Sequence, residues 1–319
     1  MTKQVAILMS TYNGEKYLAE QIESIINQSY SNWHLYIRDD GSTDNTVKII
    51  KKYSSQNSKI TFYNENNIKN IGVTNSFVEL LMGTSADFYM FSDQDDFWKS
   101  EKVNVTVKAM LNNSAYDKPI CVFSELEVVD KDLNPLRRMN GHNVWLDFPH
   151  FLFGNCVTGC TMMINQRLKD TLRLEQTDFN KVYLHDWWIA LFASAFGKLI
   201  YLNQPTILYR QHGDNVEGSK KDNIFTLIRR SINMRHELTG LIKIFTMDKE
   251  FWRLFSSQLH GTNYQYLSNY IHALSVGSFK RNLRLLFNYP PKRAHLKGNI
   301  LFSYLILTRK NTIRKKLLK

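Results

Sequence analysis

The N-terminal part of the chain, up to residue 98, alternates short apolar runs with segments of helical spacing. Val5–Met9 is apolar without interruption, which is typical of a parallel strand buried on both faces. Apolar residues between 17 and 26 then recur at the spacing of an amphipathic helix. The alternation continues with strands expected at 33–37, 60–63 and 88–91 and helices around 47–50 and 73–82. This order predicts an α/β fold with a mostly parallel central sheet and helices on both faces.

Beyond residue 118 the pattern is less regular. Short apolar runs predict strands at 120–123, 199–202 and 206–209. After Gly218 the chain becomes basic, aromatic and helical in its spacing. We therefore expect a Rossmann-like domain over residues 1–218, followed by a mainly α-helical region over residues 219–319.

The charge is divided in the same way. The chain of 319 residues has a formal net charge of +12. Residues 1–218 contain 21 Lys and Arg against 25 Asp and Glu, whereas residues 219–319 contain 20 against 4. The acidic first part argues against a nucleic-acid groove, so no nucleic-acid partner is expected. Basic helices with apolar residues suit an anionic membrane surface, while a solvated bundle or a homo-oligomer contact remains the alternative.

Targeting signals and cysteines bear on the compartment. About six apolar residues near the N-terminus are too few for a signal peptide, and no run approaches the ~20 apolar residues of a spanning helix. The three cysteines, Cys121, Cys156 and Cys160, cannot all pair, and their spacing does not suit a zinc site. We expect a cytoplasmic protein that is peripheral at the inner face of the cell membrane.

Polar residues cluster where three of the predicted strands end. They are Thr11-Tyr12-Asn13, Asp39-Asp40 and Asp93-Gln94-Asp95-Asp96. Ligands bind beyond the carboxyl ends of the strands in sheets of this kind. Two carboxylates spaced by one residue suit a hard divalent cation and the phosphates that such a cation keeps in its shell.

Four sequence elements together resemble a known family. They are Ala6–Asn13, the DDGSTDNT segment at 39–46, Asn70-Ile71-Gly72 and the SDQDDFW segment at 92–98. In this order they resemble the inverting glycosyltransferases of family 2, which have the GT-A fold, over about residues 1–218. The SDQDDxW form is most similar to bacterial rhamnosyltransferases that build cell-wall or O-antigen polysaccharides from dTDP-L-rhamnose. The resemblance implies a nucleotide-diphosphate-sugar donor, a lipid-linked saccharide acceptor, and a divalent cation, Mn²⁺ or Mg²⁺.

The resemblance also implies which residues contact the nucleotide. Thr11, Tyr12 and Asn13 would border it. Asp39 would accept a hydrogen bond from a pyrimidine N–H, and Asp93 would lie near the ribose. A pyrimidine N–H needs an acceptor of this kind, which is consistent with a carboxylate at the end of the second strand.

The remaining roles concern the cation and the proton transfer. Asp95 and His212 would bind the metal, and Asp186 would deprotonate the acceptor hydroxyl. The family often has a Glu-Asp pair at the base, whereas this chain has His185-Asp186, so His185 either orients the base or is a buried structural histidine. Further contacts with donor or acceptor are expected at Asn70, Asp96, Trp98, Gly159, His185, Trp187 and Arg210.

Three other functions compete with this one. A UDP-sugar-dependent galactosyl- or glucosyltransferase of capsule synthesis stays open, because no motif locates the residues that read the sugar. A dinucleotide oxidoreductase is disfavoured, because Thr11–Glu15 stands where a Gly-x-Gly-x-x-Gly loop would be. A non-catalytic membrane-surface adaptor would not need carboxylates at Asp39, Asp95 and Asp186.

Overall fold

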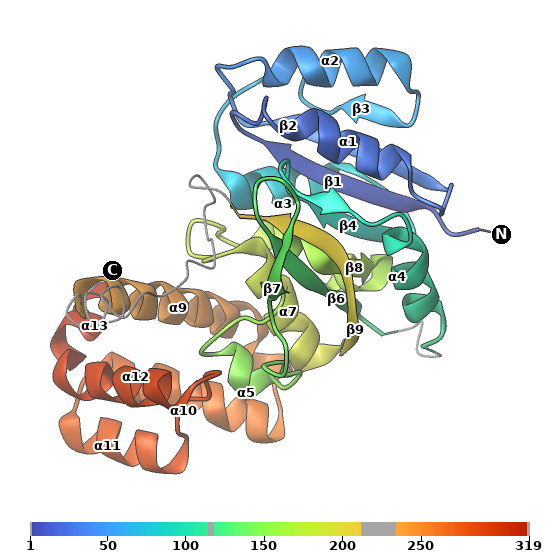
Figure 1. Cartoon of the computed structure of the whole chain (residues 1–319). Coiled ribbons are helices and arrows are strands. Elements are labelled where there is room, and N and C mark those ends of the chain that lie inside the picture. The colour runs from blue at the N-terminus through green and yellow to red at the C-terminus, as the bar shows by residue number, and fades with distance from the viewer. Residues whose placement is uncertain (1, 114–117, 212–233, 318–319) are drawn as a thin grey trace. The chain divides into compact units, whose positions relative to one another are not determined.

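A computed structural model describes residues 2–113, 118–211 and 234–317. The chain forms two compact units (Figure 1). The first, called the sheet unit here, comprises Met1–Val144, Cys156–Leu174 and His185–Gly218. The second, called the helical unit, comprises Trp145–Asn155, Glu175–Leu184 and Ser219–Lys319.

The sheet unit begins with the alternation that the hydrophobic pattern predicts. Its strands are β1 (Val5–Thr11), β2 (Trp33–Asp39), β3 (Ile60–Phe62), β4 (Phe88–Ser92), β5 (Phe97–Trp98), β6 (Ile120–Val129), β7 (Pro135–Arg138), β8 (Met162–Asn165) and β9 (Lys198–Arg210). Its helices are α1 (Leu18–Ile26), α2 (Thr46–Gln56), α3 (Val73–Gly83), α4 (Lys102–Leu111), α6 (Gln166–Thr171) and α7 (His185–Phe196), with a 3₁₀ turn, η1, at Gly159–Thr161.

All described strands join one sheet, in the order β3-β2-β1-β4-β8-β6-β9-β5, with β7 paired to β6. The first four strands are parallel, as predicted from their buried apolar runs. Strand β8 is antiparallel to both of its neighbours, so the second half of the sheet is mixed. Strand β1 lies between β2 and β4, which places the ends of all three strands at one edge.

Strand β9 differs from its prediction. The pattern predicts two short strands, at 199–202 and 206–209, whereas the structure has one strand of 13 residues. Its parallel pairing with β6 shifts between Ser124–Leu202 and Glu125–Pro205, so the two polar residues Asn203 and Gln204 are absorbed as a bulge. The strand thus passes Pro205 without ending.

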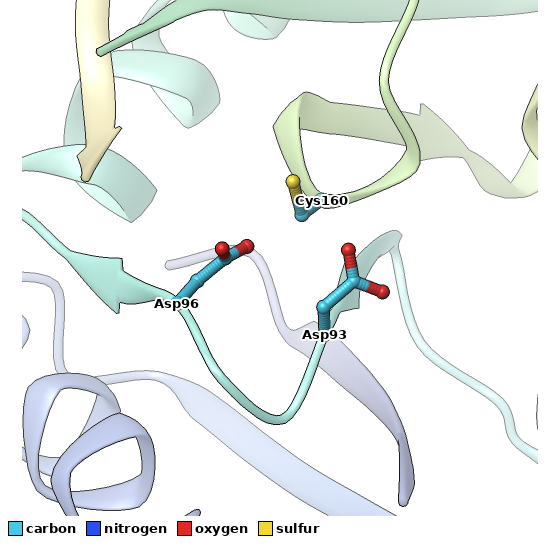
Figure 2. A group of neighbouring side chains, drawn as sticks. All are labelled: Asp93, Asp96 and Cys160. Atoms are coloured by element: carbon cyan, nitrogen blue, oxygen red, sulfur yellow. The ribbon is translucent and has the colours of Figure 1, made fainter. Parts of the chain in front are cut away.

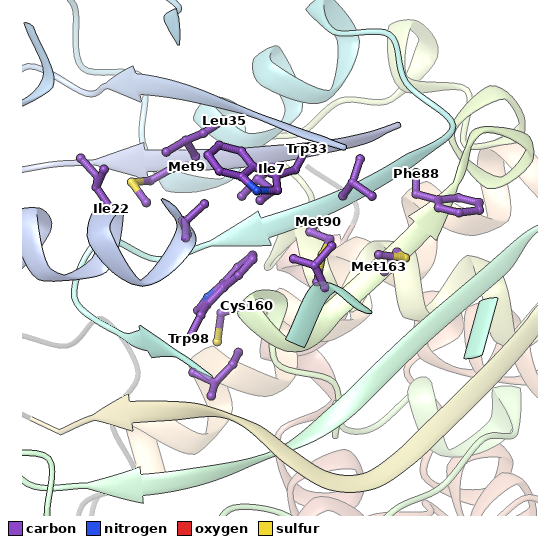
Figure 3. Packing of buried hydrophobic residues seen from close by; sticks show 14 of the residues in the cluster. Ile7, Met9, Ile22, Trp33, Leu35, Phe88, Met90, Trp98, Cys160 and Met163 are labelled. Carbon is purple, nitrogen blue, oxygen red and sulfur yellow. The ribbon is translucent and has the colours of Figure 1, made fainter. Parts of the chain in front are cut away.

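The core of the sheet unit lies on the face covered by α1 and α4. Ile7 and Met9 of β1 pack there with Ile22 of α1 and Leu35 of β2 (Figure 3). Each of these side chains is fully buried. Burying a side chain of this size contributes ~2 kcal/mol relative to leaving it in water, so the edge that bears the polar loops rests on a rigid base.

The helical unit contains α5 (Phe148–Phe151), α9 (Met234–Phe255), α10 (Gly261–Val276), α11 (Phe279–Asn288), α12 (Leu296–Thr308) and α13 (Lys310–Leu317). Aromatic rings pack between these helices, for example Phe245 on Phe302 with ring centres 6.0 Å apart. Among the described residues, no helix is both long enough and apolar enough to cross a membrane.

Two segments from the middle of the chain belong to the helical unit. Phe148 packs on Phe251 with ring centres 5.6 Å apart, and the Asp178 N–H donates to the Glu250 carboxylate at 2.9 Å. The sequence-based division at residue 218 assigns these segments to the first domain, because hydrophobic spacing does not report which distant segments meet. The domains 1–218 and 219–319 stay a prediction.

Candidate functional site

The loop after β1 is fastened to the acidic loop after β4. The Gln94 side chain accepts a hydrogen bond from the Tyr12 N–H at 2.8 Å and donates one to the Tyr12 carbonyl at 2.9 Å. Gly14 makes this approach feasible, because a Cβ there would lie 2.2 Å from Oε1 of Gln94. Tyr12 leaves half of its surface in solvent, so its ring is available to a ligand.

Asp39, the expected reader of the nucleobase, is fully buried at the end of β2. Its carboxylate accepts hydrogen bonds from the Thr11 hydroxyl at 2.9 Å, the Ser42 hydroxyl at 2.6 Å and the backbone N–H groups of Gly41 and Ser42. A carboxylate has about four acceptor positions. A nucleobase N–H would therefore have to share or replace one of the two hydroxyl donors.

Asn13 joins the same loops. Its side-chain oxygen accepts a hydrogen bond from the Thr43 N–H at 2.9 Å, and its own N–H donates to the Ser42 hydroxyl at 2.9 Å. The backbone of Asn13 has φ +49°, a left-handed conformation that asparagine tolerates better than most residues. The predicted contacts Thr11, Tyr12, Asn13 and Asp39 thus lie around one rim.

Asp40 orders the loop that contains Asn70. Its carboxylate accepts hydrogen bonds from the buried Arg38 guanidinium at 2.9 Å and from the N–H groups of residues 71–72. Asn70 is exposed beside Gly41, whose missing Cβ would lie 3.3 Å from the Asn70 N–H. Asn70 is therefore held next to the nucleobase rim.

Four carboxylates gather at the ends of β4 and α7. The pKa of Asp93, which is partly buried, is raised to about 7, chiefly by burial and then by the negative charges of Asp95 and Asp186. Asp96 also belongs to this group, because burial first and then the charges of Asp93 and Asp95 raise its pKa well above the ordinary value. The structure therefore brings the predicted base, Asp186, to the predicted donor carboxylates.

Asp96 and Trp98 do not line the site, contrary to the expectation that they contact donor or acceptor. Asp96 is fully buried, and neither of its carboxylate oxygens has a hydrogen-bond partner among the described residues. Trp98 is 1% exposed and packs in the core (Figure 3). The Lys102 ammonium lies 4.5 Å from the centre of the Trp98 ring, and burial lowers the Lys102 pKa to about 8. No ion pair joins Asp96 to Lys102 among the described residues, but the charge of Asp96 partly opposes this lowering of the Lys102 pKa.

Cys160 faces the two aspartates at the ends of this loop. Figure 2 shows Asp93 and Asp96 with their carboxylates directed toward the thiol, and one ligand atom of each residue lies within 4.8 Å of the others. Burial, together with the charges of Asp96 and Asp93, raises the pKa of the Cys160 thiol well above its usual value. The thiol is therefore protonated at neutral pH and is a poor metal ligand. The three cysteines are all buried and free, in agreement with the sequence.

The cluster of carboxylates that includes Asp93 and Asp95 suits a divalent cation. Its charged oxygen donors repel one another, as the raised pKa of Asp93 shows, and a cation among them would remove that repulsion. Carboxylate oxygens are the donors that Mg²⁺ and Mn²⁺ prefer. Of the two predicted ligands, Asp95 is half-buried in the acidic loop, whereas His212 lies outside the described residues.

Asp186 is the second residue of the helix α7, where the backbone of a glycine holds one of its carboxylate oxygens. Oδ2 of Asp186 accepts a hydrogen bond from the Gly159 N–H at 2.9 Å. A Cβ on Gly159 would lie 3.1 Å from Nε2 of His185 and 3.5 Å from Cβ of Asp186. Gly159 is itself buried, so the structure gives it a role beneath the base rather than against the donor sugar.

His185 is packed among aromatic rings. It stacks on Phe77 with ring centres 4.3 Å apart and lies 5.3 Å from Phe91. Neither ring nitrogen has a hydrogen-bond partner in the described part of the chain, and burial lowers the pKa of His185 to about 3. Of the two interpretations of this residue, the neutral structural histidine fits better. Trp187 is 5% exposed, which favours core packing over sugar stacking.

Arg210, for which a contact with donor or acceptor is expected, has its side chain inside the protein. It is 2% exposed, and its guanidinium pairs with Glu20 and lies 4.4 Å from the centre of the Tyr17 ring. It also donates to the carbonyls of Lys131 and Asp95, the latter at 3.1 Å. Arg210 therefore positions the acidic loop.

The sequence analysis assigned no role to Gln94 or to Lys102. Gln94 lies inside the acidic motif but carries no charge, so the charge pattern predicts no role for it. Lys102 is placed by the fold on the buried side of α4, and its distance from the motif gave no sign of this.

Comparison with known proteins identifies relatives over most of the chain. The family described as Glycosyl transferase family 2 matches residues 6–172. A dTDP-rhamnosyl transferase from Shigella flexneri, RfbG, is 28% identical over 292 residues, which are 86% of this chain and 94% of the relative. An uncharacterized glycosyltransferase from Haemophilus influenzae is 34% identical over 241 residues, or 75% and 91% of the two chains.

A solved structure has the same fold. The crystal structure of residues 1–349 of TarS from S. aureus aligns with a TM-score of 0.55 and 14% identity, covering 97% of this chain and 92% of that one. At this identity the alignment speaks for the fold alone, which is the expected GT-A fold with helices following it.

Proposed function

The chain belongs to glycosyltransferase family 2, and from that premise we propose that it transfers L-rhamnose from dTDP-L-rhamnose to a lipid-linked saccharide. The step belongs to bacterial cell-surface polysaccharide synthesis and inverts the configuration at the anomeric carbon. The observation that carries the proposal is the position of Asp186 beside Asp93, where its charge contributes to the raised pKa of that residue. A proton acceptor and a donor-binding carboxylate thus share one site.

Asp186 acts as the base in this proposal. It removes the proton of the acceptor hydroxyl as the hydroxyl oxygen attacks the anomeric carbon, and the nucleoside diphosphate departs on the opposite side. The Gly159 N–H and the N-terminal end of α7 both favour the negative charge that a base needs before the reaction. The Gly159 N–H donates to Oδ2 and the Trp187 N–H donates to Oδ1, so both carboxylate oxygens are oriented, and the acceptor hydroxyl would use a remaining lone pair of one of them.

A divalent cation, Mn²⁺ or Mg²⁺, completes the site. Asp95 would hold it, with Asp93 nearby and with His212 as a predicted further ligand. When bound, it offsets the charge of the diphosphate leaving group. The residues around it keep the acidic loop in place: Gln94 fastens the loop to Tyr12, and Arg210 holds its Asp95 carbonyl.

The rim formed by Thr11, Tyr12, Asn13 and Asp39 receives the nucleoside. Buried Asp39 supplies a fixed acceptor for a pyrimidine N–H, and the exposed Tyr12 ring can lie against the base. The proposal of thymidine rather than uridine rests on the 28% identity to the dTDP-rhamnosyl transferase.

The enzyme works at the cytoplasmic face of a membrane in this proposal. Residues 219–319 have 20 Lys and Arg against 4 Asp and Glu, which suits an anionic surface that carries a lipid-linked acceptor.

A thermal-shift comparison of dTDP, UDP and GDP, each with Mn²⁺, tests the donor. A bound nucleotide stabilises the folded state by about 2.7 kcal/mol at a hundred times its Kd, so the preferred nucleotide raises Tm most. A larger shift with UDP than with dTDP would point to a galactosyl- or glucosyltransferase instead. No shift with any nucleotide would contradict the assignment of the site.

A further inference from the structure

Helix α11 packs one side inside the protein and leaves a separate apolar side largely exposed. The buried residues of the helix are Asn282 and Leu285, whereas Phe279, Leu283 and Phe287 are 49%, 52% and 87% exposed. At about 100° per residue, the three exposed side chains fall within an arc of about 80°, centred about 130° from the buried pair. The exposed side is therefore a separate apolar stripe and not the margin of the core.

Helix α12 repeats this arrangement. Leu296, Ile300 and Tyr304 are 74%, 61% and 49% exposed and have the same spacing of four residues. The buried Phe302 and Ile306 are centred about 140° away around the helix. The two helices contact each other and lie side by side in Figure 1. We call their six exposed side chains the apolar stripes.

The segment that contains the apolar stripes is basic, although its Lys292 lies 4.0 Å from the Asp147 carboxylate. Residues 251–319 contain 13 Lys and Arg and no Asp or Glu. Lys280 and Lys297 follow the first residue of each stripe and are exposed, which places them at its border. Lys310 lies over the ring of Phe279, 5.6 Å from its centre. Any surface that covers the stripes must therefore accept apolar groups and also supply negative charge.

We propose that the apolar stripes enter the headgroup and upper acyl region of an anionic lipid bilayer, with the bordering lysines at the level of the phosphates. Exposed aromatic and aliphatic side chains next to Lys and Arg are the composition that binds such a surface. This inference rests on the proposed function and extends it. It names the residues that would bring the enzyme to a lipid-linked acceptor.

A second copy of the chain is the competing occupant, and its charge disfavours it. Pairing two such faces would bring the exposed cations of one copy, Lys280 and Lys297 among them, against those of the other, with no acidic residue between 251 and 319 of either copy to separate them. Each cation near an anionic bilayer is instead attracted to it, and this attraction weakens as salt screens the charges.

Sedimentation of the full chain with vesicles tests the proposal. The vesicles contain phosphatidylglycerol mixed with phosphatidylcholine, or phosphatidylcholine alone, and no sugar donor is added. We expect binding to the anionic vesicles that weakens between about 0.1 M and about 0.5 M NaCl. The double variant Leu283→Ser, Phe287→Ser should lower the partition coefficient at least about tenfold.

The matched control is Leu136→Ser on β7, since Leu136 is 51% exposed against 52% for Leu283. It should bind vesicles as the natural sequence does. Unchanged binding by the double variant, or no binding of the natural sequence to anionic vesicles, would overturn the proposal. So would a dimer in light scattering that the double variant separates, without any vesicle binding.

The failure of this proposal can be told apart from failure of the proposed function. Asp186→Asn should bind vesicles as well as the natural sequence does, because the base is not needed for membrane contact. Vesicle binding without sugar transfer by the natural sequence would refute the function alone. Sugar transfer to a soluble acceptor without vesicle binding would refute the membrane surface alone.

Discussion

The Gly159 N–H donates a 2.9 Å hydrogen bond to Oδ2 of Asp186. The donor belongs to the turn η1 and the acceptor to the first turn of α7, so the two elements are joined at the proposed base. A carboxylate with one oxygen fixed in this way has a defined orientation before any acceptor arrives.

Replacing Asp186 by Asn should abolish transfer and leave donor binding intact. The amide keeps the shape of the side chain but cannot take the proton of the acceptor hydroxyl, so we expect kcat to fall about a thousandfold. Initial rates of sugar transfer and a titration with nucleotide measure the two effects. Asp132→Asn, at an exposed turn residue, is the control and should be neutral. Near-normal turnover of Asp186→Asn would remove the base assignment.

Gly159→Ala should slow transfer by moving the base. The added Cβ would lie 3.1 Å from Nε2 of His185 and 3.5 Å from Cβ of Asp186, so neighbours must shift by a few tenths of an ångström. We expect a fall in kcat of about tenfold, with donor binding preserved. Gly240→Ala in α9 has no neighbour within 4 Å and should instead stabilise its helix by ~1 kcal/mol. Equal kinetics for both variants would contradict the positioning role of Gly159.

Gly14→Ala should destabilise the protein through Gln94. The new Cβ would lie 2.2 Å from Oε1 of Gln94, so this flexible side chain would have to move away and lose its two hydrogen bonds to Tyr12, each of which contributes about 1 kcal/mol. In the double variant Gly14→Ala, Gln94→Ala the obstructing atoms are gone, so its free energy of unfolding should match that of Gln94→Ala alone. Urea unfolding of all four proteins completes the cycle, and purely additive losses would exclude the predicted contact.

His185 should make stability fall in acid. Its pKa is lowered to about 3 in the folded protein, against about 6.5 when unfolded, so between these values only the unfolded chain binds the proton. The free energy of unfolding should therefore decrease as pH drops below 6.5, by up to about 1.4 kcal/mol per pH unit from this residue.

The variant His185→Phe tests this assignment. It removes the titrating group while keeping a ring beside Phe77, so urea unfolding between pH 7 and pH 4 should depend less on pH. His142→Gln, at an exposed histidine, is the control and should follow the natural sequence. An unaltered slope for His185→Phe would assign the acid sensitivity to other groups.

Chelation should stop transfer reversibly. The clustered carboxylates around Asp93 suit a divalent cation, and the diphosphate leaving group needs its charge offset. We expect activity to be lost in EDTA and to return with Mn²⁺ or Mg²⁺. Full activity after exhaustive chelation would refute the cation requirement.

The first half of the fold followed directly from the sequence. A strand buried on both faces is continuously apolar, so Val5–Met9 and Phe88–Phe91 could be placed without knowledge of their partners. The gathering of Asp39 and Asp93 at one sheet edge followed from the parallel order. These features depend on local pattern and on a simple topological rule.

What could not be predicted depends on contacts between distant segments. From the sequence, Arg210 is expected to be an exposed residue near a loop. In the structure it is buried, and its guanidinium contacts Glu20 and Tyr17, which lie some 190 positions earlier. Glu125 is likewise fully buried, where its carboxylate accepts hydrogen bonds from the N–H groups of residues 140–141 and from the Tyr201 hydroxyl. A hydropathy scale predicts exposure for both residues, because it takes no account of the hydrogen bonds that a buried polar side chain makes.

Strand β9 links the two chemical halves of the site. It starts two residues after α7, the helix whose second residue is the base, and ends at Arg210, which donates a hydrogen bond to the Asp95 carbonyl. The turn between α7 and β9 is tight as well, because a Cβ on Gly197 would lie 2.2 Å from the Pro119 carbonyl oxygen. The residues proposed to act on the leaving group and on the nucleophile are thus connected through one strand. An enzyme for a different acceptor would therefore need new side chains around β9. A shift of Asp186 toward another hydroxyl would also move the acidic loop that is proposed to bind the donor.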